Sequence, residues 1–121
     1  MRCRPRPIAT FACRSVSFKG IVTCGFELSR TEYTVMMHLL SDAEELTASE
    51  IAKDLAKDRT TVQRAVMSLT GKNILRRRQS NNPRGGYTFF YSIKDKDQLK
   101  QRILDIIEQW TAEIRREMTA W

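Results

Sequence analysis

The sequence has no hydrophobic run near the roughly 18 residues that a membrane-spanning helix needs, and residues 1–10 hold arginines and prolines but no apolar signal-peptide segment. We therefore expect a cytoplasmic protein with no membrane partner. With 41% hydrophobic and 29% charged residues, the composition is typical of a globular chain. A length of 121 residues allows one compact domain and a long helix, but no second folded domain for a ligand.

Catalytic and metal-binding residues are also scarce. The chain has one histidine, no Gly-x-Ser-x-Gly motif and no phosphate-binding glycine loop, so we expect neither enzymatic activity nor a cofactor. The odd number of cysteines, all within the first 24 residues, argues against a disulfide framework. The nominal zinc ligands are Cys3, Cys13, Cys24 and His38. Their gaps of 9, 10 and 13 residues lack the close pairs of structural zinc sites, so no metal is predicted.

Positive charge is concentrated in one part of the chain. The net charge is +7, and residues 57–86 carry eight basic residues against one acid, whereas residues 27–56 carry two bases and seven acids. Residues 1–26 add five bases and no acid, and residues 87–121 balance at six of each. A focused basic patch is typical of a protein that binds a polyanion, although a solvated basic face is the alternative.

Helix start signals mark three helices in the first part of the chain. The capping-box pattern, a serine or threonine three residues before a glutamate, predicts helices that begin at Ser29 and Thr47 and end near residues 41 and 56. Asp58 suits the N-cap of a third helix, 59–69. Because two or three residues join the second and third helices, we expect a helix-turn-helix. The apolar stripe of the first helix is expected at Tyr33, Met36, Met37 and Leu40.

The hydrophobic period changes to two after residue 73. Residues 74–79 and 87–93 are predicted strands of a hairpin, and the loop 80–86 between them is rich in glycine and asparagine. Residues 97–120 then return to a helical period, which predicts a helix ~36 Å long. The aromatic face of the second strand, expected to serve the core, consists of Tyr87, Phe89 and Tyr91, followed by Ile93.

The last predicted helix is longer than so small a domain can cover. Its apolar stripe begins at Leu99, and exposing the rest would leave a large hydrophobic patch, so we expect a homodimer. A two-fold dimer would set two DNA-reading helices about one turn of DNA apart. A helix that folds back on its own core is the alternative. The predicted dimer-interface residues are Ile103, Ile106, Ile107, Trp110, Ile114, Met118 and Trp121.

The third predicted helix has the side chains that read DNA. The second helix of a helix-turn-helix enters the major groove, where arginine suits guanine and glutamine suits adenine. Gln63 and Arg64 are the best candidates for base contacts. A basic hairpin tip suits the minor groove or the DNA backbone. The predicted DNA-binding residues are Arg59, Thr60, Thr61, Gln63, Arg64 and Ser68 in the helix, and Arg76, Arg77, Arg78 and Arg84 in the hairpin.

Together these elements predict a mainly α fold with a small β-hairpin (α+β), namely a winged helix-turn-helix with a long C-terminal dimerisation helix. The expected division of the chain is a basic N-terminal arm at 1–26, a DNA-binding domain at 27–94 and the dimerisation helix at 95–121. The predicted function is a transcriptional regulator that binds specific sequences in double-stranded DNA as a homodimer.

Three stretches carry a resemblance to a known group of proteins: Glu50–Leu55, Asp58–Leu69 and Gly85–Tyr91. They resemble the winged-helix domain of archaeal TrmB-type regulators, with wider similarity to MarR-type regulators, over roughly residues 27–120. The resemblance implies DNA binding by residues 59–64 and the hairpin, and dimerisation through terminal helices. TrmB-type proteins continue into a sugar-binding domain that this sequence lacks, so the resemblance implies no effector.

Two other functions stay open at this point. A winged helix also serves as a protein-interaction module of the transcription machinery, although its third helix would then be apolar or acidic outside rather than basic. A redox or metal sensor that uses the N-terminal cysteines would still act through DNA. The target operator, the effector and the direction of regulation are not predicted.

Overall fold

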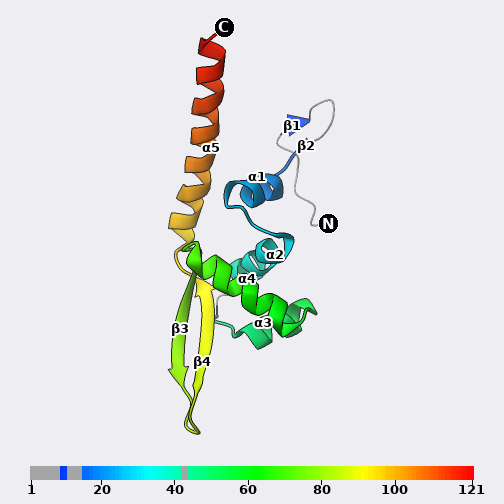
Figure 1. Cartoon of the computed structure of the whole chain (residues 1–121), viewed down its shortest axis with the longest axis vertical. Coiled ribbons are helices and arrows are strands. Elements are labelled where there is room, and N and C mark those ends of the chain that lie inside the picture. The colour runs from blue at the N-terminus through cyan, green and yellow to red at the C-terminus, as the bar shows by residue number, and fades with distance from the viewer. Residues whose placement is uncertain (1–8, 11–14, 42–43) are drawn as a thin grey trace.

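The computed structural model of the chain describes residues 9–10, 15–41 and 44–121. The hairpin and the last helix extend in opposite directions from a body of shorter helices (Figure 1). No helix in these ranges is both long and apolar enough to cross a lipid bilayer. The elements are β1 (Ala9–Thr10), β2 (Ser15–Val16), α1 (Phe18–Gly25), α2 (Arg30–Ser41), α3 (Ala48–Leu55), α4 (Arg59–Gly71), β3 (Leu75–Asn81), β4 (Tyr87–Ile93) and α5 (Lys96–Thr119).

The predicted capping boxes are both present. At the start of α2, the Glu32 N–H donates to Ser29 Oγ at 3.1 Å, and the Ser29 N–H donates to Glu32 Oε1 at 2.7 Å. Thr47 and Glu50 make the same reciprocal pair at the start of α3. Each box satisfies two backbone donors at a helix start, which is why these two helices begin where the sequence predicts.

The turn between α3 and α4 confirms the helix-turn-helix spacing. Ala56 adopts the left-handed conformation with φ of 53°, and the Lys57 N–H donates to the Ala52 carbonyl at 2.9 Å, which ends α3. The Asp58 carboxylate accepts from the Thr61 N–H at 2.9 Å, so it is the N-cap of α4 as predicted. Helix α4 runs two residues beyond the predicted end, to Gly71.

The buried stripe of α2 differs from the prediction. Met36 is buried as expected, but Met37 is exposed, and Tyr33 and Leu40 are only half-buried. The reason is that Glu32 belongs to the inner face through its contacts with α4, and residues three, four and seven positions later share that face. The residues that α2 buries are therefore Glu32, Val35, Met36 and Leu39.

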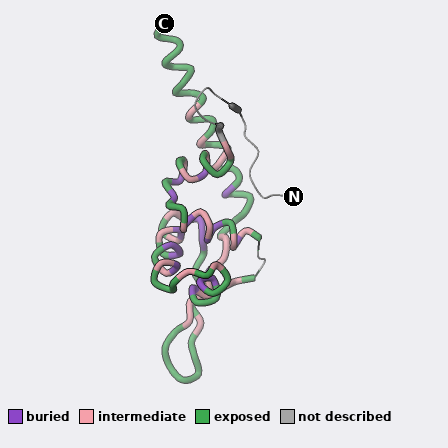
Figure 2. Tube along the Cα trace, turned by 90° about the vertical axis from the view of Figure 1, so that its right-hand side faces the viewer, coloured by how far each residue is buried: buried purple, intermediate pink, exposed green. Residues whose placement is uncertain are grey.

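The hairpin is longer and less buried than predicted. Strand β3 runs to Asn81, because the Asn82 N–H donates to the Gly86 carbonyl at 3.1 Å and tightens the loop. Most of the hairpin extends beyond the helical body (Figure 2). The expectation that its aromatic residues fill the core is therefore wrong for Tyr87, which is 63% exposed, whereas Tyr91 is 1% exposed.

Helix α5 is attached to the body only at its base. Asp95 caps it by accepting from the Gln98 N–H, and Leu99 is its one buried residue. The Arg102 guanidinium lies 4.9 Å from the Phe26 ring centre and donates to the Asn73 carbonyl at 3.2 Å. These contacts fix the direction in which α5 leaves the body, and Ile103 and Ile106 pack against the core beside them.

Gly25 makes the close approach of α1 and α5 possible. A Cβ added there would lie 2.9 Å from Ile106 Cγ2, closer than packed atoms tolerate. Gly25→Val is therefore expected to lower the free energy of unfolding by about 1–3 kcal/mol, measured by urea denaturation. The matched control is Gly71→Ala, where an added Cβ meets nothing within 4 Å. A Gly25→Val protein as stable as the parent would contradict this packing.

Glu32 carries charge inside the fold. Burial alone would raise its pKa, but hydrogen bonds from Ser29 and Ser68 and the positive charge of Lys72, with Nζ 3.9 Å from Oε2, outweigh that effect and lower it. A carboxyl whose pKa is lower in the folded state stabilises the fold above the unfolded value near 4.5. This contribution is lost as the pH falls through the folded pKa.

Glu32→Gln is expected to destabilise the protein at pH 7 by about 1 kcal/mol, because the variant weakens the capping box and the charged contacts. Denaturation curves of both proteins between pH 7 and pH 3 measure the gap, which is expected to shrink below the pKa. Glu108→Gln, an exposed carboxyl on α5, serves as the control. A gap that stays constant in acid would rule out a charged Glu32 as its cause.

Candidate nucleic-acid interface

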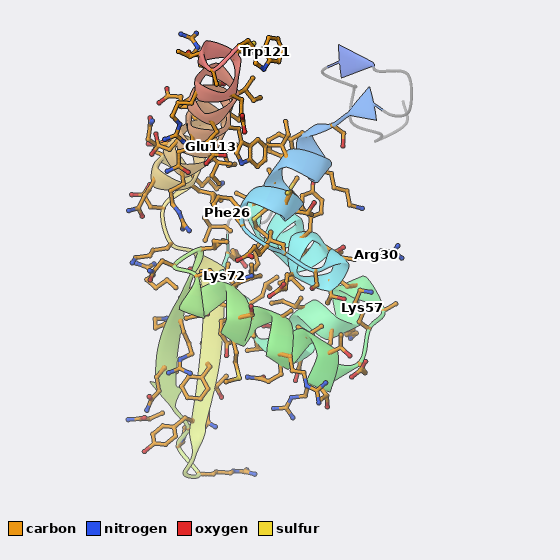
Figure 3. All side chains as sticks on the ribbon, turned by 45° about the horizontal axis from the view of Figure 1, so that its top comes forward. Phe26, Arg30, Lys57, Lys72, Glu113 and Trp121 are labelled. Carbon is orange, nitrogen blue, oxygen red and sulfur yellow. The ribbon has the colours of Figure 1, made fainter. Side chains whose placement is uncertain are left out.

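The predicted DNA-binding residues of α4 fall into an outward group and an inward group. Arg59, Thr60 and Arg64 are exposed, and together with half-buried Gln63 they line a shallow hollow on the helix surface. They face outward because the opposite side of α4 carries the predicted core stripe, which is buried. The ends of α4 are marked by Lys57 and Lys72 (Figure 3). The buried stripe consists of Val62, Ala65, Val66 and Leu69.

The inward group, Thr61 and Ser68, has partners within the protein. The Thr61 hydroxyl donates to Asp58 Oδ1 at 2.5 Å. This bond and the one from the Thr61 N–H hold the pKa of Asp58 below its usual value, against a small effect of burial. Ser68 hydrogen-bonds Glu32. Thr61 thus stabilises the start of α4, and Ser68 stabilises the packing of α4 on α2.

A groove separates α4 from the wing, which we define as the β3–β4 hairpin with its loop, residues 75–93. The Gln63 Nε2 donates to the Tyr91 hydroxyl at 3.4 Å across the floor of this groove, which ties the helix to β4. The groove is lined by Thr47, Ala48, Ser49, Arg59, Gln63, Tyr87, Thr88, Phe89 and Tyr91.

The arginines of the wing are not equivalent. The Arg78 Nε donates to Glu45 Oε1 at 2.8 Å, and its guanidinium lies 4.7 Å from the Phe90 ring centre. On the opposite face of the hairpin, the Arg77 guanidinium lies 4.5 Å from the Phe89 ring centre. All four arginines of the wing are exposed, but Arg78 is paired to an acidic residue that precedes the wing.

Two exposed residues near the predicted DNA-binding side chains were not among the predicted site residues. Tyr87 lines the groove beside the wing tip, and Met67 lies on the outward side of α4 with 57% of its surface exposed. The position of Tyr87 next to Gly85 and Gly86 was the available signal. For Met67 the signal was its helical spacing from Thr60 and Arg64.

The nominal metal ligands are not brought together in the described part of the chain. Cys3 and Cys13 lie outside the described residues, and Cys24 is exposed on α1. The His38 Nε2 lies 3.0 Å from Asp54 Oδ2, so this side chain links α2 to α3. No group of three candidate ligands occurs among the residues that the structure describes.

The predicted dimer-interface residues divide along α5. Ile103 and Ile106 pack against the core of the same chain, and Trp110 is half-buried. Beyond them the helix is exposed, and Trp121 stands clear of the rest of the molecule with 94% of its surface accessible (Figure 3). The large apolar side chains that are exposed along α5 and at the residue after it are Leu104, Ile107, Ile114, Met118 and Trp121.

This architecture matches a known protein family and several solved structures. The family model of the DnaD N-terminal domain matches residues 22–114. A solved structure from Methanosarcina mazei Go1, described as a possible transcriptional regulator, is 30% identical, covers 98% of each chain and has a TM-score of 0.86.

Two more distant structures share the fold. A MarR crystal structure has 16% identity and a TM-score of 0.54, over 78% of this chain and 68% of MarR. MepR of S. aureus in complex with DNA has 18% identity and a TM-score of 0.52, over 81% of this chain and 84% of MepR. The expected winged helix-turn-helix fold with a long C-terminal helix is thereby confirmed, and the similarity to MarR holds for the fold. The narrower TrmB-type resemblance stays a prediction.

Proposed function

The chain belongs to the DnaD N-terminal domain family, and we propose that it is a transcriptional regulator that binds specific sequences in double-stranded DNA. The observation that carries the proposal is the outward face of α4, where Arg59, Thr60, Gln63 and Arg64 meet next to the wing groove. The similar M. mazei protein, a possible transcriptional regulator, and the DNA-bound MepR of the same fold support it.

In this proposal α4 enters the major groove. The helix has 13 residues, about 20 Å, and the groove is roughly 12 Å wide, so an exposed polar face of this size fits. Arg64 suits the acceptors of guanine. Gln63 suits adenine, because its amide group, which donates one hydrogen to Tyr91, still has a second N–H and its carbonyl oxygen. Arg59 at the start of α4 is close to the phosphate backbone of the same groove.

The wing contacts the neighbouring backbone or minor groove. Arg84 lies at its tip, where Gly85 and Gly86 have φ of 94° and 81°, a left-handed conformation that favours glycine. Arg76 adds positive charge further along the strand. Arg78, paired to Glu45, holds the wing against the helical body instead of contacting DNA directly.

We further propose that residues 95–121 form the dimerisation segment of a homodimer, with 27–94 as the DNA-binding unit and 1–26 as a basic segment whose helix α1 packs on the core through Val22. The support is the row of exposed apolar residues on α5, which no other described element covers. We also propose that this chain is related to the TrmB-type regulators. A dimer would present two copies of α4 to the two halves of a palindromic site.

Arg64→Ala is expected to weaken binding to a selected operator by roughly 10- to 100-fold, since it removes a base contact and a positive charge. Titration of labelled duplex across a salt series measures both the affinity and the salt slope. Arg115→Ala, which removes the same charge from the exposed side of α5, is the control and should stay near parental affinity. Equal effects of the two variants would mean that only net charge matters.

Ile114→Glu is expected to convert the dimer into a monomer, because it places a charge in the centre of the exposed apolar row. Analytical ultracentrifugation at several concentrations measures the change. Gln109→Glu adds the same charge to α5 at a position outside that row and should leave the dimer intact. A parent protein that sediments as a monomer at all concentrations would contradict the dimer and leave the DNA-binding face to be judged on its own test.

A further inference from the structure

Met67 is the single large apolar side chain exposed on α4, all of which lies in the described part of the chain. More than half of its surface, 57%, is accessible. Its position is central to the outward face: with 3.6 residues per turn, Met67 and Arg64 both lie within about 30° of the direction opposite the buried stripe. Thr60, one turn earlier, lies on the same line.

The neighbours of Met67 point to DNA as what covers it. On the outward face it is flanked by Gln63 and Arg64, and Gly71, one turn later, has no side chain. An isolated apolar group among basic and polar residues does not make the contiguous patch that a protein partner would require. It does match the DNA major groove, where acceptors and phosphates surround one apolar group, the C5-methyl of thymine.

We propose that Met67 contacts the C5-methyl group of a thymine, so that the operator of this protein requires an A·T pair where the second half of α4 crosses the major groove. The inference rests on the proposed function and adds a specificity-determining residue to it. Methionine suits this contact because its unbranched thioether side chain is flexible and polarisable, and it adapts to a methyl group without a fixed geometry. Arg64 on the preceding turn orients the helix by its polar contacts.

Substitution of thymine by deoxyuridine tests the contact, because it removes the methyl group and changes nothing else at the base edge. The full chain first selects its site from a random duplex library. Each thymine of that site is then replaced in turn by deoxyuridine, and the affinities of the parent and of Met67→Ala are measured for every duplex. At one thymine of each half-site, the parent is expected to lose about three- to tenfold in affinity on loss of the methyl.

Met67→Ala should bind thymine and deoxyuridine equally at that position, and Met67→Leu should keep most of the preference. The control is Met37→Ala, which truncates a methionine on α2 that is exposed to 36% and lies off this face. Melting curves of all three variants check that the fold is retained. A parent indifferent to deoxyuridine at every position, or a Met67→Ala protein with the parental preference, would overturn the inference while leaving DNA binding intact. Failure to select any sequence would overturn the proposed function together with it.

Discussion

Tyr91 is the residue on which the relative placement of helix and wing depends. Its backbone N–H donates to the Leu46 carbonyl at 2.8 Å and its carbonyl accepts from the Leu46 N–H at 3.1 Å, which joins β4 to the segment before α3. Its ring is buried, and its hydroxyl accepts from Gln63 on α4. Tyr91 therefore links β4 to the segment before α3 through its backbone and to Gln63 of α4 through its side chain. A wing attached in this way is held in position beside α4, as the proposed recognition of one DNA segment by both would require.

Charge in this molecule serves two separate purposes. Glu32 and Glu45 each pair with a basic residue over a long sequence distance, Glu32 with Lys72 and Glu45 with Arg78, and these pairs hold elements together. The other exposed arginines of α4 and of the wing are the ones that would remain available to a polyanion. The excess of basic residues in 57–86 thus overstates the charge that would be free to contact DNA, since Lys72 and Arg78 pair with acidic residues of the same chain.

Helix α5 is longer than the core of this small domain can cover. Packing against α1 and the turn after α4 covers α5 as far as Ile106, and Gly25 is what permits that contact. Beyond half-buried Trp110, the apolar side chains of Ile114, Met118 and Trp121 are exposed, because a core of this size has no further surface to offer. The helix that carries the proposed dimer contact is therefore anchored next to the end of α4, so a dimer would directly set the spacing between the two copies of α4.

By itself the sequence determined the starts of α2, α3 and α4, the short turn of the helix-turn-helix and the existence of the hairpin, because caps, turn residues and hydrophobic periods act between residues close in the chain. The grouping of Arg59, Gln63 and Arg64 on one face followed from the same periodicity. Only the tertiary structure decided which side of α2 is buried, that Arg78 pairs with Glu45, and that Tyr87 lies outside the core. These outcomes depend on contacts between distant segments, such as the 33 residues between Glu45 and Arg78, for which no local pattern exists.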